Sequence, residues 1–440
     1  MEKKRNWLIL THCCNLDGRA ASQHIDDRLP YLKREGITPL MLTGPTGPPL
    51  ADTLHVQVYS PAPSGLRSEL GYQLRTATVG RPWFRLFGSL LRLLVLPFYL
   101  IEKVFIDVEG QWSWFLTAAV RGCALCARHD PEIIYSTGGP FSAHIAAAII
   151  AARCRKPWIA ELQDPLVHDD WQRSRRAFRV YAWVERFVCR RADGVIFVTD
   201  EARRRATDRN GLGDRGWVVH PGADPGLVPQ VPYRQGTHCR FAHFGSLAGS
   251  RNVTVFLDAL ERFFKEEPDR VGLVRLDLYG NGDRGVRERI QAFPYPDCVT
   301  DHGRLTRKEA HAAMRQSDVL LLIQNKSDFS SETIPSKTYE YLQMGRPILG
   351  LVHKNPELDG MLRSQGHVPV DATDPGAVLR GIRQSVDRWR ESGCEGSTLP
   401  PSPYTVAAAV GRLIEVAGEI LRRRTDGIVP TRSQDRSRIS

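Results

Sequence analysis

Short apolar segments alternate with longer helical segments along this chain, and no other feature constrains its fold as strongly. Residues 8–10, 132–135 and 158–161 are apolar runs of strand length, and amphipathic stretches separate them. Such strand–helix alternation predicts parallel sheets that are covered by helices on both faces. The alternation stops at residues 210–236, which are rich in Gly and Pro, and it restarts at residue 241. The sequence therefore predicts an α/β protein with two tandem doubly wound, Rossmann-like domains.

We place the domain boundaries where this pattern changes. The predictions are an N-terminal domain over residues 1–215, a linker over 216–236 and a C-terminal domain over 237–400. A final helix over 401–424 is expected to pack back toward the N-terminal domain, and the polar tail 425–440 is expected to be disordered. Ligands of doubly wound sheets bind beyond the carboxyl ends of the strands, so we expect a central cleft that both domains face.

Charge and cysteine content narrow the possible partners. The 440 residues carry a net charge of +11, which favours an acidic partner such as a nucleotide or an anionic lipid. No nucleic-acid-binding motif is present, and we expect no nucleic acid partner. Nine cysteines without regular spacing indicate reduced thiols and a cytoplasmic protein. The apolar region 83–106 is interrupted by charges, so it is predicted either to lie on a membrane surface or to form an ordinary buried helix pair.

Two glutamates stand eight positions apart, at Glu332 and Glu340, with a proline and a lysine between them. Pro335 can open a helix, whose free N–H groups attract an anion, and Lys337 adds a positive charge. Glu340 lies one turn beyond Lys337 on the same helix face. This order suits a nucleoside diphosphate with a sugar attached. The alternative is a capped helix with solvated charges.

Three glycine-rich turns follow predicted strands in the C-terminal half. Glycines at such positions let backbone amides approach a phosphate closely, and an arginine can bind the phosphate through two hydrogen bonds. Each turn alone could be only a tight turn, but together they predict a shared nucleotide crevice. The residues concerned are Gly245, Ser246, Arg251, Asn252, Gly280, Asn281 and Gly303.

Together these motifs resemble the donor-binding half of retaining glycosyltransferases of family 4, which have the GT-B fold. The matching segments are 245–252, 278–282, 302–305, 317–321 and 335–349. Residues 134–144 and 156–165 resemble a subgroup that builds bacterial surface polysaccharides. The resemblance covers most of residues 1–420 and is weakest over 45–106.

The resemblance implies a role for each matching residue. Glu332 would contact the donor sugar, and Glu340 would accept hydrogen bonds from the ribose. Arg251 and Lys337 would neutralise the leaving diphosphate, where negative charge develops in the transition state. The chain has no Asp-x-Asp motif, so no metal or other cofactor is expected. Retention of configuration by front-face attack is implied by the family alone.

The N-terminal half is expected to hold the acceptor. Asp164 follows a predicted strand and either positions or deprotonates the acceptor hydroxyl, or caps the next turn. Relatives often carry a basic residue before the matching Asp, where this chain has Gln163, and this departure puts the role of Asp164 in doubt. Further acceptor candidates, each with an alternative as a turn, cap or packing residue, are Asp17, Gly18, Arg19, Gly138, Gly139 and His144.

A basic, aromatic segment follows this strand. A helix of that composition holds anionic lipid or a lipid diphosphate, and the alternative is a solvated helix face. We expect a protein peripheral to the inner face of the cell membrane. The candidate lipid-facing residues are Arg173, Arg175, Arg176, Arg179 and Trp183.

These observations predict an enzyme that transfers a sugar, a hexosyltransferase-type glycosyltransferase. Its donor would be a nucleotide sugar and its acceptor a hydroxyl of a lipid-linked saccharide, with polyprenyl diphosphate as the expected lipid. Two alternatives share the fold. One is a nucleotide-sugar epimerase or hydrolase without an acceptor, and the other is a catalytically silent binding protein.

Overall fold

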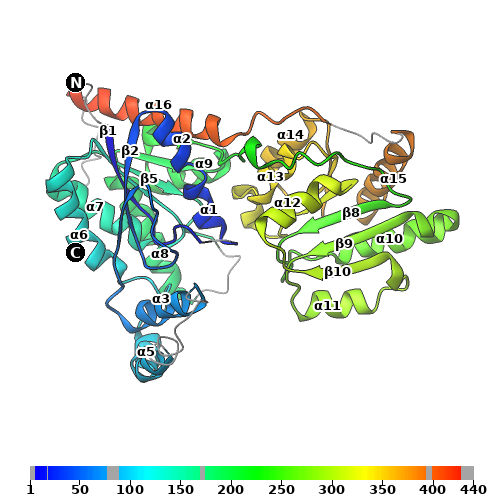
Figure 1. Cartoon of the computed structure of the whole chain (residues 1–440), viewed down its shortest axis with the longest axis horizontal. Helices are drawn as coiled ribbons and strands as arrows, with labels where there is room; N and C mark the ends of the chain where they lie inside the picture. Colours follow the sequence, from blue (N-terminus) through cyan, green and yellow to red (C-terminus); the bar gives the residue numbers. More distant parts are fainter. Residues whose placement is uncertain (1–4, 17, 77–88, 169–173, 393–398, 428–440) are drawn as a thin grey trace. The chain divides into compact units, whose positions relative to one another are not determined.

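The computed structural model describes residues 5–16, 18–76, 89–168, 174–392 and 399–427, and Figure 1 shows its elements. The chain divides into two compact units. The first runs up to His220 and includes the residues from Ala409 onward, and the second covers Pro221–Ala408.

The first unit is built on a seven-stranded sheet in the order β3-β2-β1-β4-β5-β6-β7, and every neighbouring pair is parallel. Strands β1, β2, β4, β5 and β6 are largely buried, which explains their apolar sequences, whereas the edge strand β3 is partly exposed. The strands are β1 Arg5–Leu10, β2 Ile37–Thr43, β3 Leu54–Gln57, β4 Ile133–Thr137, β5 Trp158–Leu162, β6 Gly194–Phe197 and β7 Gly216–Val218.

Helices connect these strands and cover the sheet. α6 and α7 pack against each other, and α7 also packs against β1, β4 and β5. The helices before β6 are α1 Ala20–Asp26, α2 Leu29–Arg34, α3 Pro63–Thr76, α5 Leu96–Phe105, α6 Trp114–His129, α7 Ser142–Cys154 and α8 Arg175–Arg191. α9, Asp200–Asn210, follows β6.

The first sheet extends further along the chain than the sequence indicated. Gly216–Val218 was predicted to open the linker, but these residues form strand β7 and pair with β6 in parallel. Trp217 lies opposite Ile196 in this pairing and is buried. Sequence reasoning missed this strand because three residues are too few to show a strand period and the residues after it are rich in Gly and Pro.

The last helix, α16 (Val406–Thr425), belongs to the first unit from Ala409 onward. Ile420 is buried and packs against Gly194 at the start of β6. Arg423 forms an ion pair of 2.9 Å with Asp214, and its guanidinium lies 5.6 Å from the ring centre of Trp217. The chain therefore returns to its first unit at its C-terminal end.

The second unit has a six-stranded parallel sheet in the order β10-β9-β8-β11-β12-β13. The strands are β8 Cys239–Phe244, β9 Val274–Tyr279, β10 Val299–Gly303, β11 Val319–Ile323, β12 Ile348–Val352 and β13 Val368–Asp371. The helices are α10 Thr254–Glu266, α11 Arg284–Gln291, α12 Arg307–Gln316, α13 Lys337–Gln343, α14 Pro356–Arg363 and α15 Pro375–Glu391. Two parallel sheets with helices match the predicted fold class, which is confirmed.

Candidate active site

Backbone hydrogen bonds join the three glycine turns of the second unit at the carboxyl ends of β8, β9 and β10. The Gly245 N–H donates to the carbonyl of Tyr279 at 2.7 Å, and the Gly280 N–H donates to the carbonyl of Gly303 at 2.7 Å. Gly245 has φ +119° and Gly280 has φ +143°, conformations that side chains rarely allow. The structure thus brings the predicted turns together at one edge of the sheet.

The loop after β8 is held in place by its neighbours. The Leu247 N–H donates to the carbonyl of Asn281 at 2.9 Å, and the Gly249 N–H donates to Asp283 Oδ2 at 2.9 Å. Asn252 Nδ2 donates to the Gly249 carbonyl at 2.8 Å, while its Oδ1 accepts from the N–H of Thr254 at 3.1 Å. The Asn252 side chain therefore shapes the loop, and its predicted donor contact stays a prediction.

Lys337 reaches this edge of the sheet from the start of α13. Its Nζ lies where a Cβ atom on Gly245 would stand, so the ammonium fits only because residue 245 lacks a side chain. Tyr341, one turn further along, accepts a 2.8 Å hydrogen bond from the N–H of Phe244 and ties α13 to the end of β8. The Lys337 Nζ is shielded from solvent and has no hydrogen-bond partner within the described part of the chain.

Burial changes the protonation of this cluster. Burial, with the positive charge of Arg251 as the second cause, lowers the pKa of Lys337 to about 7. Burial also lowers the pKa of His243 well below its ordinary value, with Lys337 as the next cause. The His243 ring is fully buried and its Nδ1 lies 2.9 Å from the Leu321 carbonyl. The positive charges of Lys337 and Arg251 repel each other, and an anion between them would relieve that repulsion.

Glu340 is held by two residues that the sequence did not single out. Its Oε1 lies 3.1 Å from Arg307 Nε and 3.1 Å from His311 Nε2, both on α12. Burial raises the pKa of Glu340, but these two partners outweigh it and the net shift is downward, which keeps the carboxylate ionised. Arg307 and His311 are one helical turn apart, and this spacing was the only sequence signal that the two side chains could hold one carboxylate together.

Glu332 ends a 3₁₀ turn over Asp328–Glu332 and is buried. Two amide side chains fix the segment around it. Gln324 Nε2 donates to the Ser330 carbonyl at 2.6 Å, and Asn355 Nδ2 donates to the Thr333 carbonyl at 2.8 Å. The backbone on both sides of Glu332 is therefore anchored to the ends of β11 and β12.

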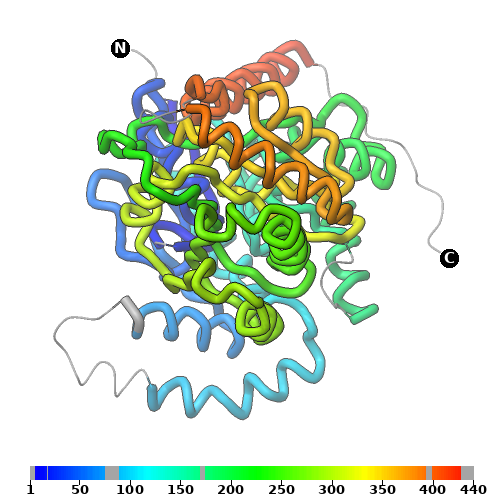
Figure 2. Tube along the Cα trace, turned by 90° about the vertical axis from the view of Figure 1, so that its right-hand side faces the viewer, coloured from blue at the N-terminus to red at the C-terminus, as the bar shows by residue number. Residues whose placement is uncertain are grey.

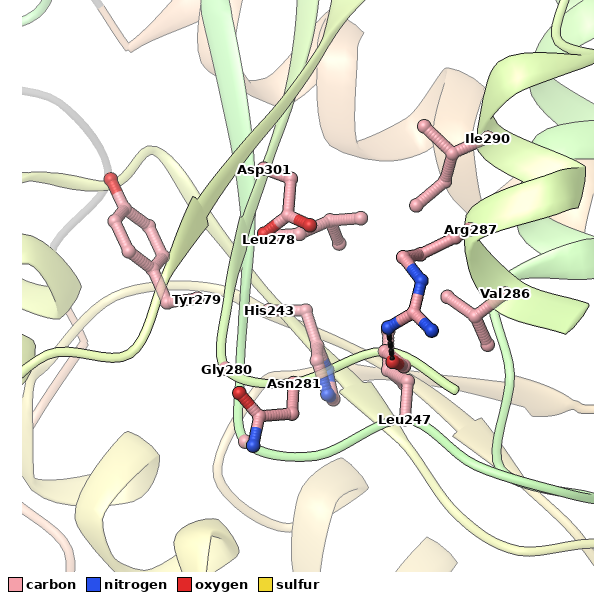
Figure 3. A pocket seen from close by; sticks show the side chains of 12 residues that line it. His243, Leu247, Leu278, Tyr279, Gly280, Asn281, Val286, Arg287, Ile290 and Asp301 are labelled. Atoms are coloured by element: carbon pink, nitrogen blue, oxygen red, sulfur yellow. Dashed lines mark hydrogen bonds between the residues drawn. The ribbon is translucent and has the colours of Figure 1, made fainter. Parts of the chain in front are cut away.

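A small pocket borders the same glycine turns (Figure 3). Its volume is about 270 Å³, including space open to solvent. His243 and Asp301 line it from the strands, and Val286, Arg287 and Ile290 line it from α11. Arg287 donates to the Gly282 carbonyl at 2.6 Å and closes one side. The pocket adjoins Gly245, which also adjoins Lys337.

In the first unit, the acceptor candidates lie after β1, β4 and β5. Gly138 has φ +114°, and a Cβ there would stand 3.0 Å from Thr11 Oγ1, so the turn after β4 lies against the end of β1. Gln163 Nε2 donates to Thr137 Oγ1 at 3.0 Å. Asp164 is exposed two residues after β5, and no atom of the described residues lies within 4 Å of the place where a Cβ on Gly139 would stand.

His144 is fully buried, unlike Asp164. Its Nδ1 lies 2.9 Å from Ser136 Oγ, which also accepts from Trp158 Nε1 at 2.8 Å. Burial lowers the pKa of His144 to about 4, so the ring is neutral. A neutral, enclosed ring favours the packing alternative for this residue.

The remaining acceptor candidates lie near α1. Gly18 has φ +71°, and Arg19 precedes α1 and donates to the Tyr72 hydroxyl at 2.6 Å. Asp17 lies outside the described residues, as does Arg173 of the basic segment. The other basic candidates stand on the outer face of α8, where Arg175, Arg176, Arg179 and Trp183 are exposed.

A buried ionic network supports the carboxyl ends of β4 and β5, and no sequence pattern predicts it. Glu161 and Arg28 are both buried, with Arg28 Nη1 2.8 Å from Glu161 Oε1. His24 Nε2 lies 3.0 Å from Glu161 Oε2, and Thr137 donates to the same oxygen at 2.6 Å. Although burial raises the pKa of Glu161, Arg28 and His24 bring it well below its ordinary value.

The carboxyl end of β1 carries a second buried pair. His12 Nε2 lies 2.9 Å from Glu69 Oε1, and both side chains are fully buried. Burial lowers the pKa of His12, but hydrogen bonds with Cys13 and Glu69 outweigh it and raise the pKa to about 9. This pair fastens the loop after β1 to α3.

Two absences concern metals and membranes. In the described parts of both units, no group of three or more His, Cys, Asp or Glu side chains is arranged to hold a metal ion. None of the helices described there is long and apolar enough to cross a membrane.

The fold is shared with solved structures across the whole chain. Anabaena HepE in complex with UDP-glucose is 14% identical, with a TM-score of 0.56, and the alignment covers 96% of this chain and 99% of HepE. Sucrose-phosphate synthase from Thermosynechococcus elongatus is 13% identical, with a TM-score of 0.56, and the coverage is 97% and 100%. TarM from S. aureus is 9% identical, with a TM-score of 0.55 and coverage of 96% and 99%. No curated protein matches the chain by sequence.

Two Rossmann-like sheets with these neighbours define a protein of the GT-B glycosyltransferase fold. Residues 32–222 match the model of the glycosyl transferase 4-like domain. This match covers part of the first unit and agrees with the family-4 resemblance predicted from the sequence.

Proposed function

We propose that this protein is a retaining glycosyltransferase that moves a hexose from a nucleotide sugar to a hydroxyl of a lipid-linked saccharide. The observation that carries the proposal is the shielded Lys337 Nζ beside Gly245, with no partner among the described residues. A buried ammonium without a hydrogen-bond partner is unfavourable, and a diphosphate would supply both hydrogen-bond acceptors and negative charge. HepE, which shares the fold, was solved with UDP-glucose, which supports a nucleotide sugar as donor.

The chemistry follows from where charge develops. The bond between the anomeric carbon and the β-phosphate oxygen breaks, and its electron pair stays on the diphosphate. Lys337 and Arg251 stabilise that charge, so no metal ion or other cofactor is required in this proposal. The acceptor hydroxyl oxygen bonds to the anomeric carbon from the same face. Its proton passes to the leaving phosphate oxygen or to Asp164.

Each carboxylate of the donor side has a separate task. Glu340 accepts hydrogen bonds from the ribose hydroxyls, and Arg307 and His311 hold it for that purpose. Glu332 contacts the donor sugar near its reacting carbon, on a segment fixed by Gln324 and Asn355. Backbone amides of the glycine turns at residues 245, 280 and 303 approach the phosphates.

The acceptor side is proposed to work at the inner face of the cell membrane. The saccharide acceptor would be carried on polyprenyl diphosphate during surface polysaccharide synthesis. The exposed arginines of α8 would bind the anionic headgroups or the lipid diphosphate. Charge reversal of Arg175, Arg176 and Arg179 should move the protein from the membrane fraction to the soluble fraction, and no shift at low salt would count against this role.

The test is a panel of nucleotide sugars, incubated with the full chain and a lipid-linked acceptor extract and read by mass spectrometry. A product heavier by one sugar supports transfer. Glu332→Ala should lose transfer while it keeps nucleotide binding, and unchanged turnover would remove Glu332 from the mechanism. Donor breakdown or isomerisation at equal rates with and without extract would support the epimerase or hydrolase alternative. Undiminished transfer in EDTA is expected.

A further inference from the structure

In α5 the apolar side chains face solvent and the polar side chains face the protein, which is the reverse of an ordinary surface helix. Glu102 accepts hydrogen bonds from the Ser64 N–H at 2.7 Å and from Trp112 Nε1 at 2.6 Å. Lys103 Nζ donates to the Val108 carbonyl at 2.7 Å. Tyr99 lies under the guanidinium of Arg67, 5.6 Å from the ring centre.

The apolar side chains of the same segment face solvent. No residue of α5 is buried. Six large apolar side chains of α5 and of the helical turn before it are between 58% and 75% exposed. They are Leu93, Leu94, Phe98, Ile101, Val104 and Phe105, and we call them the apolar arc. Single exposed apolar residues are ordinary, but a contiguous set of this size marks an interaction site.

The apolar arc covers one side of the helix. At about 100° per residue, its six positions fall within about 140° of the helix circumference. A stripe of that width normally faces a protein core. Here α5 packs against α3 and forms the outer layer, on the side of α3 away from the sheet (Figures 1 and 2). The described part of the first unit therefore leaves the stripe uncovered.

The chemistry of the apolar arc selects its partner. None of its six side chains can donate or accept a hydrogen bond. Protein interfaces of standard size carry roughly one hydrogen bond per 100–200 Å², so a protein partner would be expected to find polar atoms here. Lipid tails need none. The one acidic side chain of α5, Glu102, is turned inward, so it does not repel an anionic headgroup.

We propose that α5 lies in the plane of the lipid bilayer, with the apolar arc in the boundary between headgroups and acyl chains. Ten residues of helix span about 15 Å, half of the roughly 30 Å of a bilayer core, so α5 lies along the surface rather than across it. This inference rests on the membrane partner of the proposed function and specifies a second contact. The arginines of α8 attract headgroups, whereas α5 enters the apolar layer.

The contact of the α8 arginines and the contact of α5 differ in their response to salt. Sedimentation with vesicles of phosphatidylglycerol and phosphatidylcholine, at low and at high salt, distinguishes one contact from the other. The full chain should bind these vesicles and keep a measurable part of its binding in 0.5 M NaCl, because salt screens the arginines of α8 but not the burial of apolar area. The triple variant Phe98→Ser/Ile101→Ser/Phe105→Ser should bind at least tenfold more weakly at both salt concentrations. The matched control Leu54→Ser/Leu227→Ser/Val231→Ser, at exposed apolar positions outside the arc, should bind like the unchanged protein.

Unchanged vesicle binding by the arc variant would overturn the inference. So would a change from dimer to monomer in lipid-free solution with vesicle binding retained, since the arc would then be an interface between two copies. Nucleoside diphosphate affinity, measured on the same preparations, reports on the second unit alone. Arc-dependent vesicle binding without sugar transfer would uphold the lipid contact and reject the proposed function. Sugar transfer together with vesicle binding that does not depend on the arc would uphold the proposed function and reject the lipid contact of α5.

Discussion

The Lys337 ammonium occupies the place that a side chain on Gly245 would fill. The glycine sits at the end of β8 and the lysine at the start of α13, more than ninety positions later in the chain. A side chain at position 245 would displace the Lys337 ammonium. This contact defines the proposed phosphate site.

Lys337→Met should weaken the binding of nucleoside diphosphate by about 10- to 100-fold, because a charge-assisted hydrogen bond contributes about 1.5–3 kcal/mol. Isothermal titration calorimetry measures the affinity. Lys265→Met removes an exposed lysine from α10 and is the matched control. Equal affinities in the two variants would exclude Lys337 from the phosphate site.

Binding of nucleoside diphosphate should take up a proton at pH 8–9. The free protein holds Lys337 with a pKa of about 7, below its ordinary value of 10.5, so most of these lysines are neutral at that pH. The bound anion favours the ammonium and raises the pKa again. Calorimetry in two buffers of different ionisation enthalpy counts the protons, and Lys337→Met should abolish most of the uptake.

The same pKa has a consequence for stability. Between pH 7 and 10.5 the unfolded chain carries the Lys337 proton and the folded chain does not, so this group makes the free protein more stable as the pH rises through that window. Below pH 7 both states carry the proton and the contribution is flat. Denaturant unfolding gives the free energy of unfolding of the protein and of Lys337→Met at several pH values. The rise between pH 7 and 10.5 should be smaller in the variant.

Gly245→Ala should lose both stability and nucleotide binding. The residue has φ +119°, which costs an alanine about 1–3 kcal/mol, and the new methyl group would displace the Lys337 Nζ. Gly211→Ala is the control, since Gly211 also has positive φ, at +63°, but none of the described residues has an atom within 4 Å of where its Cβ would stand. That control should lose stability and keep its affinity. Wild-type affinity in folded Gly245→Ala would contradict the geometry described here.

Glu340→Ala should raise the donor KM by about 10- to 100-fold and change kcat less, since it removes charged hydrogen bonds to a part of the donor that does not react. Initial rates over a range of donor concentrations separate the two constants. Glu288→Ala, on the exposed face of α11, serves for comparison. A fall in kcat with an unaltered KM would place Glu340 at the reacting carbon instead.

Glu161→Gln should destabilise the first unit by about 3–5 kcal/mol, because it leaves the buried Arg28 without its counter-ion. The double variant Arg28→Met/Glu161→Gln should recover part of this loss. Thermal unfolding monitored by circular dichroism gives both values. If the single variant unfolds like the unchanged protein, the ion pair does not hold the ends of β4 and β5 together.

Much of the donor side could be predicted from the sequence because its signals are local. A strand, a glycine turn and a helix are contiguous in the chain, so Gly245, Gly280 and Gly303 were visible as turns before their hydrogen bonds were known. Glu332 and Glu340 are also close in sequence. Arg307 and His311 were missed because a helix face with one Arg and one His looks like any solvated face.

Charge and burial across distant segments could not be predicted. The partners of Glu161 come from α1, from the residue before α2 and from β4, more than a hundred positions away in two cases, and no local pattern marks such a pair. The outward face of α5 is a similar case. Its periodicity fits a buried helix equally well, and only the position of α3 decides which side meets solvent.

The sequence by itself determined the two parallel sheets and the glycine turns at the strand ends of the second unit, because period and turn chemistry are properties of neighbouring residues. The tertiary structure alone decided that Lys337 is buried beside Gly245, that Glu340 is held from α12 and that α5 shows its apolar side to solvent. Protonation, pairing and exposure depend on which distant segments the fold brings together, and that is the physical reason for the division.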